Sequence, residues 1–107
     1  MVKKLTNAVA EKFLSDAPPE KIFYMNGGRA VRNVEELSQA MEEMNEEQFS
    51  FHRNAEKNDF YNWILHVIGD VRLANELARA KTKETTLKKI NQRVDSLKKI
   101  RGEQNGK

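Results

Sequence analysis

The residues best suited to chemistry in this chain are a histidine and an aspartate, His52 and Asp59, with Asn58 beside the aspartate. General acid–base catalysis and metal binding both use such groups. A metal site needs several converging ligands, however, and the only other histidine, His66, belongs to a different expected helix. We therefore predict that His52, Asn58 and Asp59 form a structural polar cluster, with no catalytic residue and no metal site. A ligand-binding or enzymatic centre on His52 and Asp59 is the weaker alternative.

A second candidate surface is a strongly basic segment near the C-terminus. Residues 1–80 hold 10 Lys/Arg against 13 Asp/Glu, whereas residues 81–101 hold eight Lys/Arg against Glu84 and Asp95. The cations of this segment are Lys81, Lys83, Lys88, Lys89, Arg93, Lys98, Lys99 and Arg101. A helix with these charges would follow nucleic-acid phosphates, bind an acidic protein, or simply present a solvated face. Membrane binding is disfavoured, because the apolar stripe of this helix has no aromatic residue.

Two short helices are expected to position the polar cluster. Asn45 and Gln48 have the spacing of a capping box, which predicts a helix that runs through His52. Asn58 and Asp59 are suited to the start of the next helix, because they satisfy free backbone N–H groups there. The apolar residues of that helix recur with helical spacing at Phe60, Trp63, Ile64, Val67 and Ile68. Trp63 is therefore expected in the core.

The chain after this helix predicts a tight corner and two more helices. Gly69 is suited to a left-handed helix terminus, and Asp70 to the cap of the next helix. The inward face of that helix is expected at Val71, Ala74, Leu77 and Ala78. Thr82 caps a last helix over residues 83–101, with an apolar stripe at Leu87, Ile90, Val94 and Leu97. This stripe either docks on the domain or pairs with a second copy of the chain, so an oligomer stays open.

The first half of the chain predicts a helix, a hairpin and a second helix. Residues 2–14 have an amphipathic pattern at Leu5, Ala8, Val9 and Phe13, and two prolines follow. Residues 22–25 and 30–32 are strand-forming, and the Asn-Gly-Gly-Arg sequence between them is typical of a tight turn. Asn33 and Glu36 have capping-box spacing, and the helix they begin has its apolar face at Val34, Leu37, Ala40, Met41 and Met44.

Composition limits these elements to one small domain. With 107 residues, 38% hydrophobic and 33% charged, the chain has room for a single core. We expect a mostly α domain of five to six short helices with one β-hairpin near residues 22–32. This domain would span residues 1–101, with a disordered tail at 102–107. The absence of cysteine excludes disulfides and thiolate sites. We also expect a cytoplasmic location, because no apolar signal sequence or membrane span is present.

Two linked motifs extend this interpretation to a family. Residues 28–40 fit G-[RK]-x-[VLI]-[RK]-N-x-x-E-L-x-x-A, and residues 49–74 fit F-x-x-H-x-x-x-E-K-N-D-F-x-x-W-[IV]-x-x-V-x-G-D-x-x-L-A. From Phe23 to about Glu84 the chain resembles an uncharacterised small domain of archaeal proteins, with more divergent bacterial relatives. Gly27 departs from the pattern, which has Asp or Asn there. The resemblance implies an accessory module without established activity, and it singles out His52, Asn58, Asp59 and Trp63.

These observations predict a non-enzymatic interaction module that binds a protein partner and needs no cofactor. A nucleic-acid-associated protein that uses the basic segment 81–101 is the alternative. A steep salt dependence of binding would indicate nucleic acid, whereas an exposed apolar patch would favour a protein.

Overall fold

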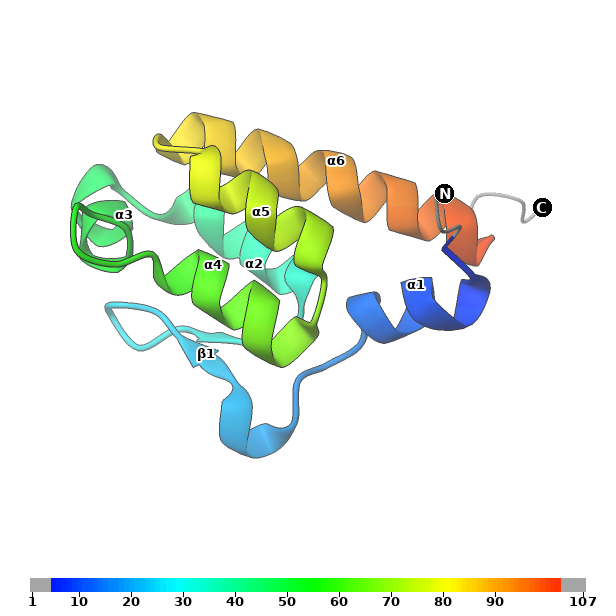
Figure 1. The fold of residues 1–107 in the computed structure, drawn as a ribbon. Coiled ribbons are helices and arrows are strands. Elements are labelled where there is room, and N and C mark those ends of the chain that lie inside the picture. The colour runs from blue at the N-terminus through cyan, green and yellow to red at the C-terminus, as the bar shows by residue number, and fades with distance from the viewer. Residues whose placement is uncertain (1–4, 103–107) are drawn as a thin grey trace.

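The computed structural model of this chain describes residues 5–102, which form a mostly helical fold with one β-hairpin (Figure 1). The α-helices are α1 (Asn7–Leu14), α2 (Val34–Glu43), α3 (Glu46–His52), α4 (Asp59–Trp63), α5 (Val71–Arg79) and α6 (Lys83–Arg101). The remaining elements are the 3-10 helix η1 (Pro19–Lys21), the π-helix η2 (Ile64–Ile68), and strands β1 (Phe23–Tyr24) and β2 (Ala30–Val31). The predicted fold class is confirmed. The predicted disordered tail lies outside the described residues, except for Gly102.

Helix α6 is the longest element of the described chain, and the other helices pack along it (Figure 1). Helix α2 runs antiparallel to α6, because Glu35 forms an ion pair with Lys98 while Ser38 hydrogen-bonds Asn91. Helix α5 lies beside α6, and α1 packs against the C-terminal part of α6. None of the described helices is both long and apolar enough to cross a bilayer.

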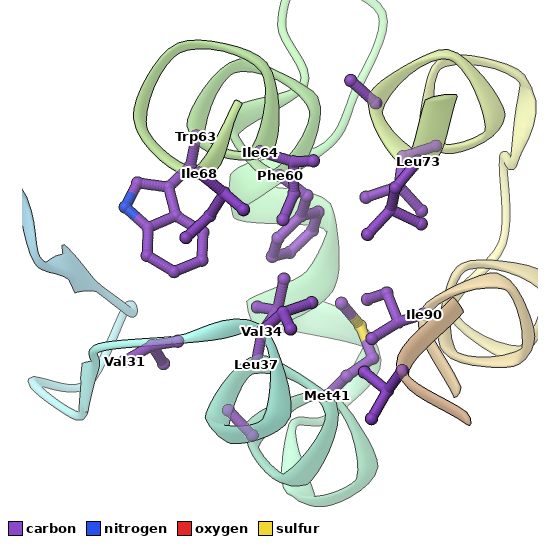
Figure 2. Close-up of a cluster of buried hydrophobic side chains, with 14 of the residues drawn as sticks. Val31, Val34, Leu37, Met41, Phe60, Trp63, Ile64, Ile68, Leu73 and Ile90 are labelled. Carbon is purple, nitrogen blue, oxygen red and sulfur yellow. The ribbon is translucent and has the colours of Figure 1, made fainter. Parts of the chain in front are cut away.

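The core lies between α2 on one side and α4 with η2 on the other, as Figure 2 shows. Its buried side chains include Val34, Leu37, Met41, Phe60, Trp63, Ile64, Ile68, Leu73 and Ile90. The predicted apolar faces of α2 and α4 are therefore confirmed. Val67 is an exception, because it is only half-buried. The π-helix η2 has wider turns than an α-helix, as the hydrogen bond from Gly69 N–H to the Ile64 carbonyl shows, and this rotates Val67 away from the core.

The hairpin covers one edge of this core. Strands β1 and β2 are antiparallel, with Phe23 opposite Val31 and Tyr24 opposite Ala30. Phe23 faces the core, where its ring centre lies 5.8 Å from that of Trp63, whereas Tyr24 is exposed. The turn has positive φ at Gly27 (105°) and Gly28 (99°). Positive φ angles at both positions account for the two successive glycines of this turn.

The corner between η2 and α5 differs in part from the prediction. Gly69 adopts φ 89°, and Asp70 caps α5 by accepting from Leu73 N–H, as predicted. The buried face of α5 is Leu73, Ala74 and Leu77, however, while Val71 and Ala78 are exposed. The prediction of Val71 and Ala78 as inward residues was wrong, because Asp70 itself turns into the core and sets the rotation of the helix.

Helix α1 is also rotated relative to its prediction. Its fully buried residues are Ala10 and Leu14, whereas Leu5, Val9 and Phe13 are half-buried and Ala8 is exposed. The small Ala10 side chain lets α1 approach α6 closely, so the face in contact is centred one residue beyond the pattern. The predicted larger apolar residues therefore line the edges of this interface.

A buried ion pair joins the corner to α6. Arg93 donates from Nε to Asp70 Oδ2 at 2.7 Å and from Nη2 to Asp70 Oδ1 at 3.0 Å. The Asp70 side chain is 2% exposed and that of Arg93 is 8% exposed. Such a pair is costly to break, because removal of one partner leaves the other charge buried without compensation.

We predict that Trp63→Ala lowers the free energy of unfolding by about 3–5 kcal/mol, because it removes a large buried ring. It also removes the hydrogen bond from Trp63 Nε1 to the Lys21 carbonyl. Urea-induced unfolding followed by circular dichroism measures this change. Val71→Ala is the control, and it should change stability by less than about 0.5 kcal/mol because Val71 is exposed. Similar values for both variants would contradict the placement of Trp63 in the core.

We predict a strong energetic coupling between Asp70 and Arg93. Arg93→Met should lower stability by about 3–5 kcal/mol, because it leaves a buried carboxylate unpaired. Asp70→Ser retains a helix cap and removes the charge. The double variant should therefore be more stable than Arg93→Met alone. A double-mutant cycle in urea measures the coupling, and simple additivity of the two single effects would argue against a linked pair.

Candidate functional site

The predicted polar cluster forms around His52, the last residue of α3. His52 Nε2 lies 2.9 Å from the backbone nitrogen of Asn26, and Nδ1 lies 2.9 Å from Asp59 Oδ2. Lys57 Nζ also contacts Asp59 Oδ2, at 3.0 Å. The cluster thus connects the hairpin turn, the end of α3 and the first turn of α4.

The hydrogen-bond partners indicate the tautomer of His52. The backbone N–H of Asn26 can only donate, so Nε2 must carry a lone pair. The proton of the neutral ring is then on Nδ1, from which it is donated to Asp59. Both nitrogens are used by the protein itself, and the residue is only 3% exposed. His52 therefore has no free nitrogen with which to exchange a proton with a substrate.

Aromatic rings surround the His52 side chain. The ring centre of His52 lies 5.0 Å from Phe23, 5.0 Å from Phe51 and 5.5 Å from Phe60. Lys57 lies over the Phe51 ring at 4.5 Å, so it covers the exposed side of the cluster. This packing excludes water from the imidazole and makes its two hydrogen bonds stronger.

The third predicted residue, Asn58, points to a different part of the fold. Its Oδ1 accepts from Tyr61 N–H and caps α4, while its Nδ2 donates to the Leu77 carbonyl at the end of α5. Arg53 makes a similar link, from Nε to the Ala80 carbonyl and from Nη2 to the Ala78 carbonyl. Asn58 and Arg53 together fix the loop between α3 and α4 to the C-terminus of α5. No motif or spacing in the sequence predicted the role of Arg53.

The predicted cluster therefore consists of two neighbouring polar groups, one around His52 and Asp59 and one around Asn58, and both hydrogen-bond other parts of the fold. In residues 5–102, no group of three or more His, Asp or Glu side chains is arranged to hold a metal ion. Every buried side-chain nitrogen and oxygen in the same residues has a hydrogen-bond partner.

The basic segment is divided by the fold. Arg93, predicted as one of the binding cations of this segment, is buried against Asp70, because its position on the helix faces the α5 corner. Lys98 pairs with Glu35 of α2, and Arg101 also has an interaction partner. The outer face of α6 carries Lys88 and Lys99, but the exposed Asp95 lies between them. The exposed cations of residues 81–101 therefore do not form one continuous ridge, and Arg93 does not belong to the outer face of α6.

The apolar stripe of α6 docks on its own domain. Ile90, Val94 and Leu97 are buried in the core, and Leu87 is partly buried against it. The alternative in which these residues pair with a second copy would require them to leave the core, so the structure favours docking.

Five cations lie on the end of α5, the loop after it and the first two turns of α6. We call this surface the basic corner; it consists of Arg79, Lys81, Lys83, Lys88 and Lys89. Within residues 5–102, none of these five side chains forms an ion pair or hydrogen bond. A hollow of about 120 Å³ is lined by Arg79 and Lys89 together with the acidic Glu76, and one of about 450 Å³ is lined by Lys81 and Arg53. Arg79 was outside the predicted segment, although it is only two residues before Lys81.

Comparisons with known proteins add no assignment. No protein-family model matches this sequence, and no curated protein or solved structure is significantly similar to it. The resemblance to the archaeal domain stays a prediction that depends on the two motifs.

We predict that His52→Phe lowers the free energy of unfolding by about 1–3 kcal/mol. The new ring keeps the aromatic packing, but the Asn26 N–H loses its acceptor and Asp59 loses a donor. His66→Phe is the matched control, since His66 is exposed and should change stability by less than about 0.5 kcal/mol. Urea unfolding measures both variants. An equally small change in the free energy of unfolding for both variants would contradict a structural role for His52.

Proposed function

We propose that this domain is a non-enzymatic interaction module that binds an acidic segment of a protein partner through the basic corner. The observation that carries the proposal is the group of five cations that have no partner of their own in the described chain. Residues 79–89 contain these five and a single acid, Glu84. Unpaired cations so close together repel one another, and an acidic ligand relieves that repulsion.

The non-enzymatic part of the proposal is supported by the use of His52. Its two ring nitrogens are bound by Asn26 and Asp59, and Phe23, Phe51 and Phe60 surround the ring. A general base needs a nitrogen within hydrogen-bond reach of its substrate. His52, the residue best suited to catalysis in the sequence, thus has both ring nitrogens occupied by structural hydrogen bonds.

A protein partner is favoured over nucleic acid by the size and surroundings of the basic corner. The antiparallel packing of α2 on α6 brings the acidic residues of the α2–α3 junction alongside the first turns of α6. These residues are Glu42, Glu46 and Glu47, whereas Glu43 pairs with Arg29 of the hairpin. Together with Asp95 on the outer face of α6, they restrict an extended phosphate backbone to a short contact. A short acidic peptide segment fits within this limit.

The exposed aromatic residues support the same preference. Proteins that bind single strands stack bases on aromatic side chains close to their cations. The large exposed aromatic residues of the described chain, Tyr24 and Phe51, belong to β1 and α3 rather than to the basic corner. Base stacking therefore has no support beside the cations.

The test is affinity capture from a native extract, with and without nuclease, by the wild type and two charge variants. Lys81→Gln, Lys88→Gln and Lys89→Gln are combined in the first variant. The second combines Lys12→Gln, Lys21→Gln and Lys99→Gln, which removes the same charge from exposed lysines elsewhere. We expect nuclease-resistant capture of a protein that the first variant loses by at least about ten-fold, since each lost ion contact weakens binding. The second variant should retain the capture within about two-fold.

Two results would contradict the proposal. Equal loss in both variants would mean that capture follows net charge and not the basic corner. Loss of capture on nuclease treatment, with a shift of labelled duplex or single-stranded DNA at micromolar protein, would establish the nucleic-acid alternative. In that case the salt dependence of the shift would measure the number of phosphates in contact.

A further inference from the structure

A groove lies at the other end of α5, between α1, the Gly69 corner and α6. Its volume is about 410 Å³, which is within the range of roughly 300–1,000 Å³ for small-ligand sites. Leu5, Phe13 and Val71 give it apolar walls. Leu5 and Phe13 are half-buried, and Val71 is 55% exposed, so these walls face solvent in part. This surface was not predicted from the sequence, because Val71 was expected to face the core.

A buried arginine also lines the groove. Arg93 has five N–H donors, of which one on Nε and one on Nη2 bind Asp70. Its Nη1 group has no acceptor among residues 5–102, although the side chain is only 8% exposed. No fully buried side-chain donor of the described chain lacks an acceptor, so Nη1 has some access to solvent, and Arg93 lines the groove. The guanidinium group therefore has donors beyond those that bind Asp70, in a groove that Asp70 and Arg72 line together with the apolar residues.

The remaining donors of Arg93 favour a hydrogen-bond acceptor as the ligand group, and Arg72 at the rim favours a charged one. Asp70 is fully engaged, by Leu73 N–H and by Arg93. Arg72 lies at the rim and is 74% exposed, and its contact with Glu76 is long, at 3.8 Å. A planar carboxylate accepts two hydrogen bonds from a guanidinium edge. The apolar walls then accommodate the group to which that carboxylate is attached.

We propose that this groove binds a carboxylate carried on an apolar group, with Arg93 as its hydrogen-bond donor and Leu5, Phe13 and Val71 as the apolar contact. The site is distinct from the basic corner and does not depend on it. Two sources have this chemistry: a free monocarboxylic acid with a hydrocarbon chain, and the C-terminal residue of a polypeptide that ends in an apolar side chain.

Nuclear magnetic resonance titration of the ¹⁵N-labelled full chain tests the proposal. The probes are octanoate, its amide, a tripeptide that ends in leucine with a free carboxylate, and the amide of that tripeptide. We expect saturable shifts of the Gly69 and Val71 amides and of Arg93 Nε–H with at least one carboxylate. Each amide should bind at least about ten-fold more weakly, because it lacks the charge. Octanoate binding alone would indicate a free acid, and tighter peptide binding a polypeptide terminus.

A charge variant at the mouth of the groove locates the site without disturbing the buried ion pair. Val71→Glu places a carboxylate in the first turn of α5, where a helix tolerates it well. It should weaken carboxylate binding by at least about ten-fold through repulsion. Ser50→Glu adds the same charge on α3, and it should leave binding within about two-fold of wild type.

Three outcomes would overturn the proposal. One is the absence of saturable shifts with both carboxylates at millimolar concentration. The second is equal affinity for the carboxylates and their amides, which would mean that the guanidinium does not select charge. The third is unchanged binding by Val71→Glu, because the ligand would then lie elsewhere.

Discussion

The ion pair between Asp70 and Arg93 is the contact on which the arrangement of the last three helical elements depends. Asp70 follows a left-handed glycine, caps α5 and accepts two hydrogen bonds from Arg93. A carboxylate this deeply buried is tolerated only with such partners. A well-packed apolar pair would give similar stability, so the particular effect of the ion pair is to specify which turn of α6 lies against the corner. That alignment places Ile90 and Leu97 in the core.

His52 has an equivalent role at the opposite end of the core. It connects the hairpin to α4 through two hydrogen bonds, one to the Asn26 backbone and one to Asp59. Arg53, the next residue, reaches the carbonyl groups at the end of α5. The short helices α3 and α4, of seven and five residues, have little stability of their own. The apolar faces of these helices are too short to determine how the helices pack. Directional hydrogen bonds at the helix ends therefore determine their positions.

The elements that local chemistry determines were predictable from the sequence. The caps at Asn33, Asn45 and Thr82 and the glycine turn depend on a few neighbouring residues, and they occur where the pattern placed them. The burial of Arg93 was not predictable, because its partner is 23 residues away in the sequence and arginine is normally exposed. The cluster at His52 was predicted as a group, but its acceptor bond to Asn26 depends on the tertiary position of the hairpin.

The burial of Arg93 also changes how the charges of the domain are interpreted. In the sequence, eight cations form one basic segment. In the fold, Arg93 and Lys98 bind acidic residues of their own domain, and Arg93 lines the groove at one end of α5, whereas Lys81, Lys83, Lys88 and Lys89 belong to the basic corner at the other end. Val71 at the groove and Arg79 at the basic corner are eight positions apart, which is about 12 Å along a helix. An extended chain of about four residues covers this distance. A polypeptide with acidic residues before an apolar C-terminus is therefore long enough to contact both surfaces, whereas a free carboxylic acid would occupy the groove alone.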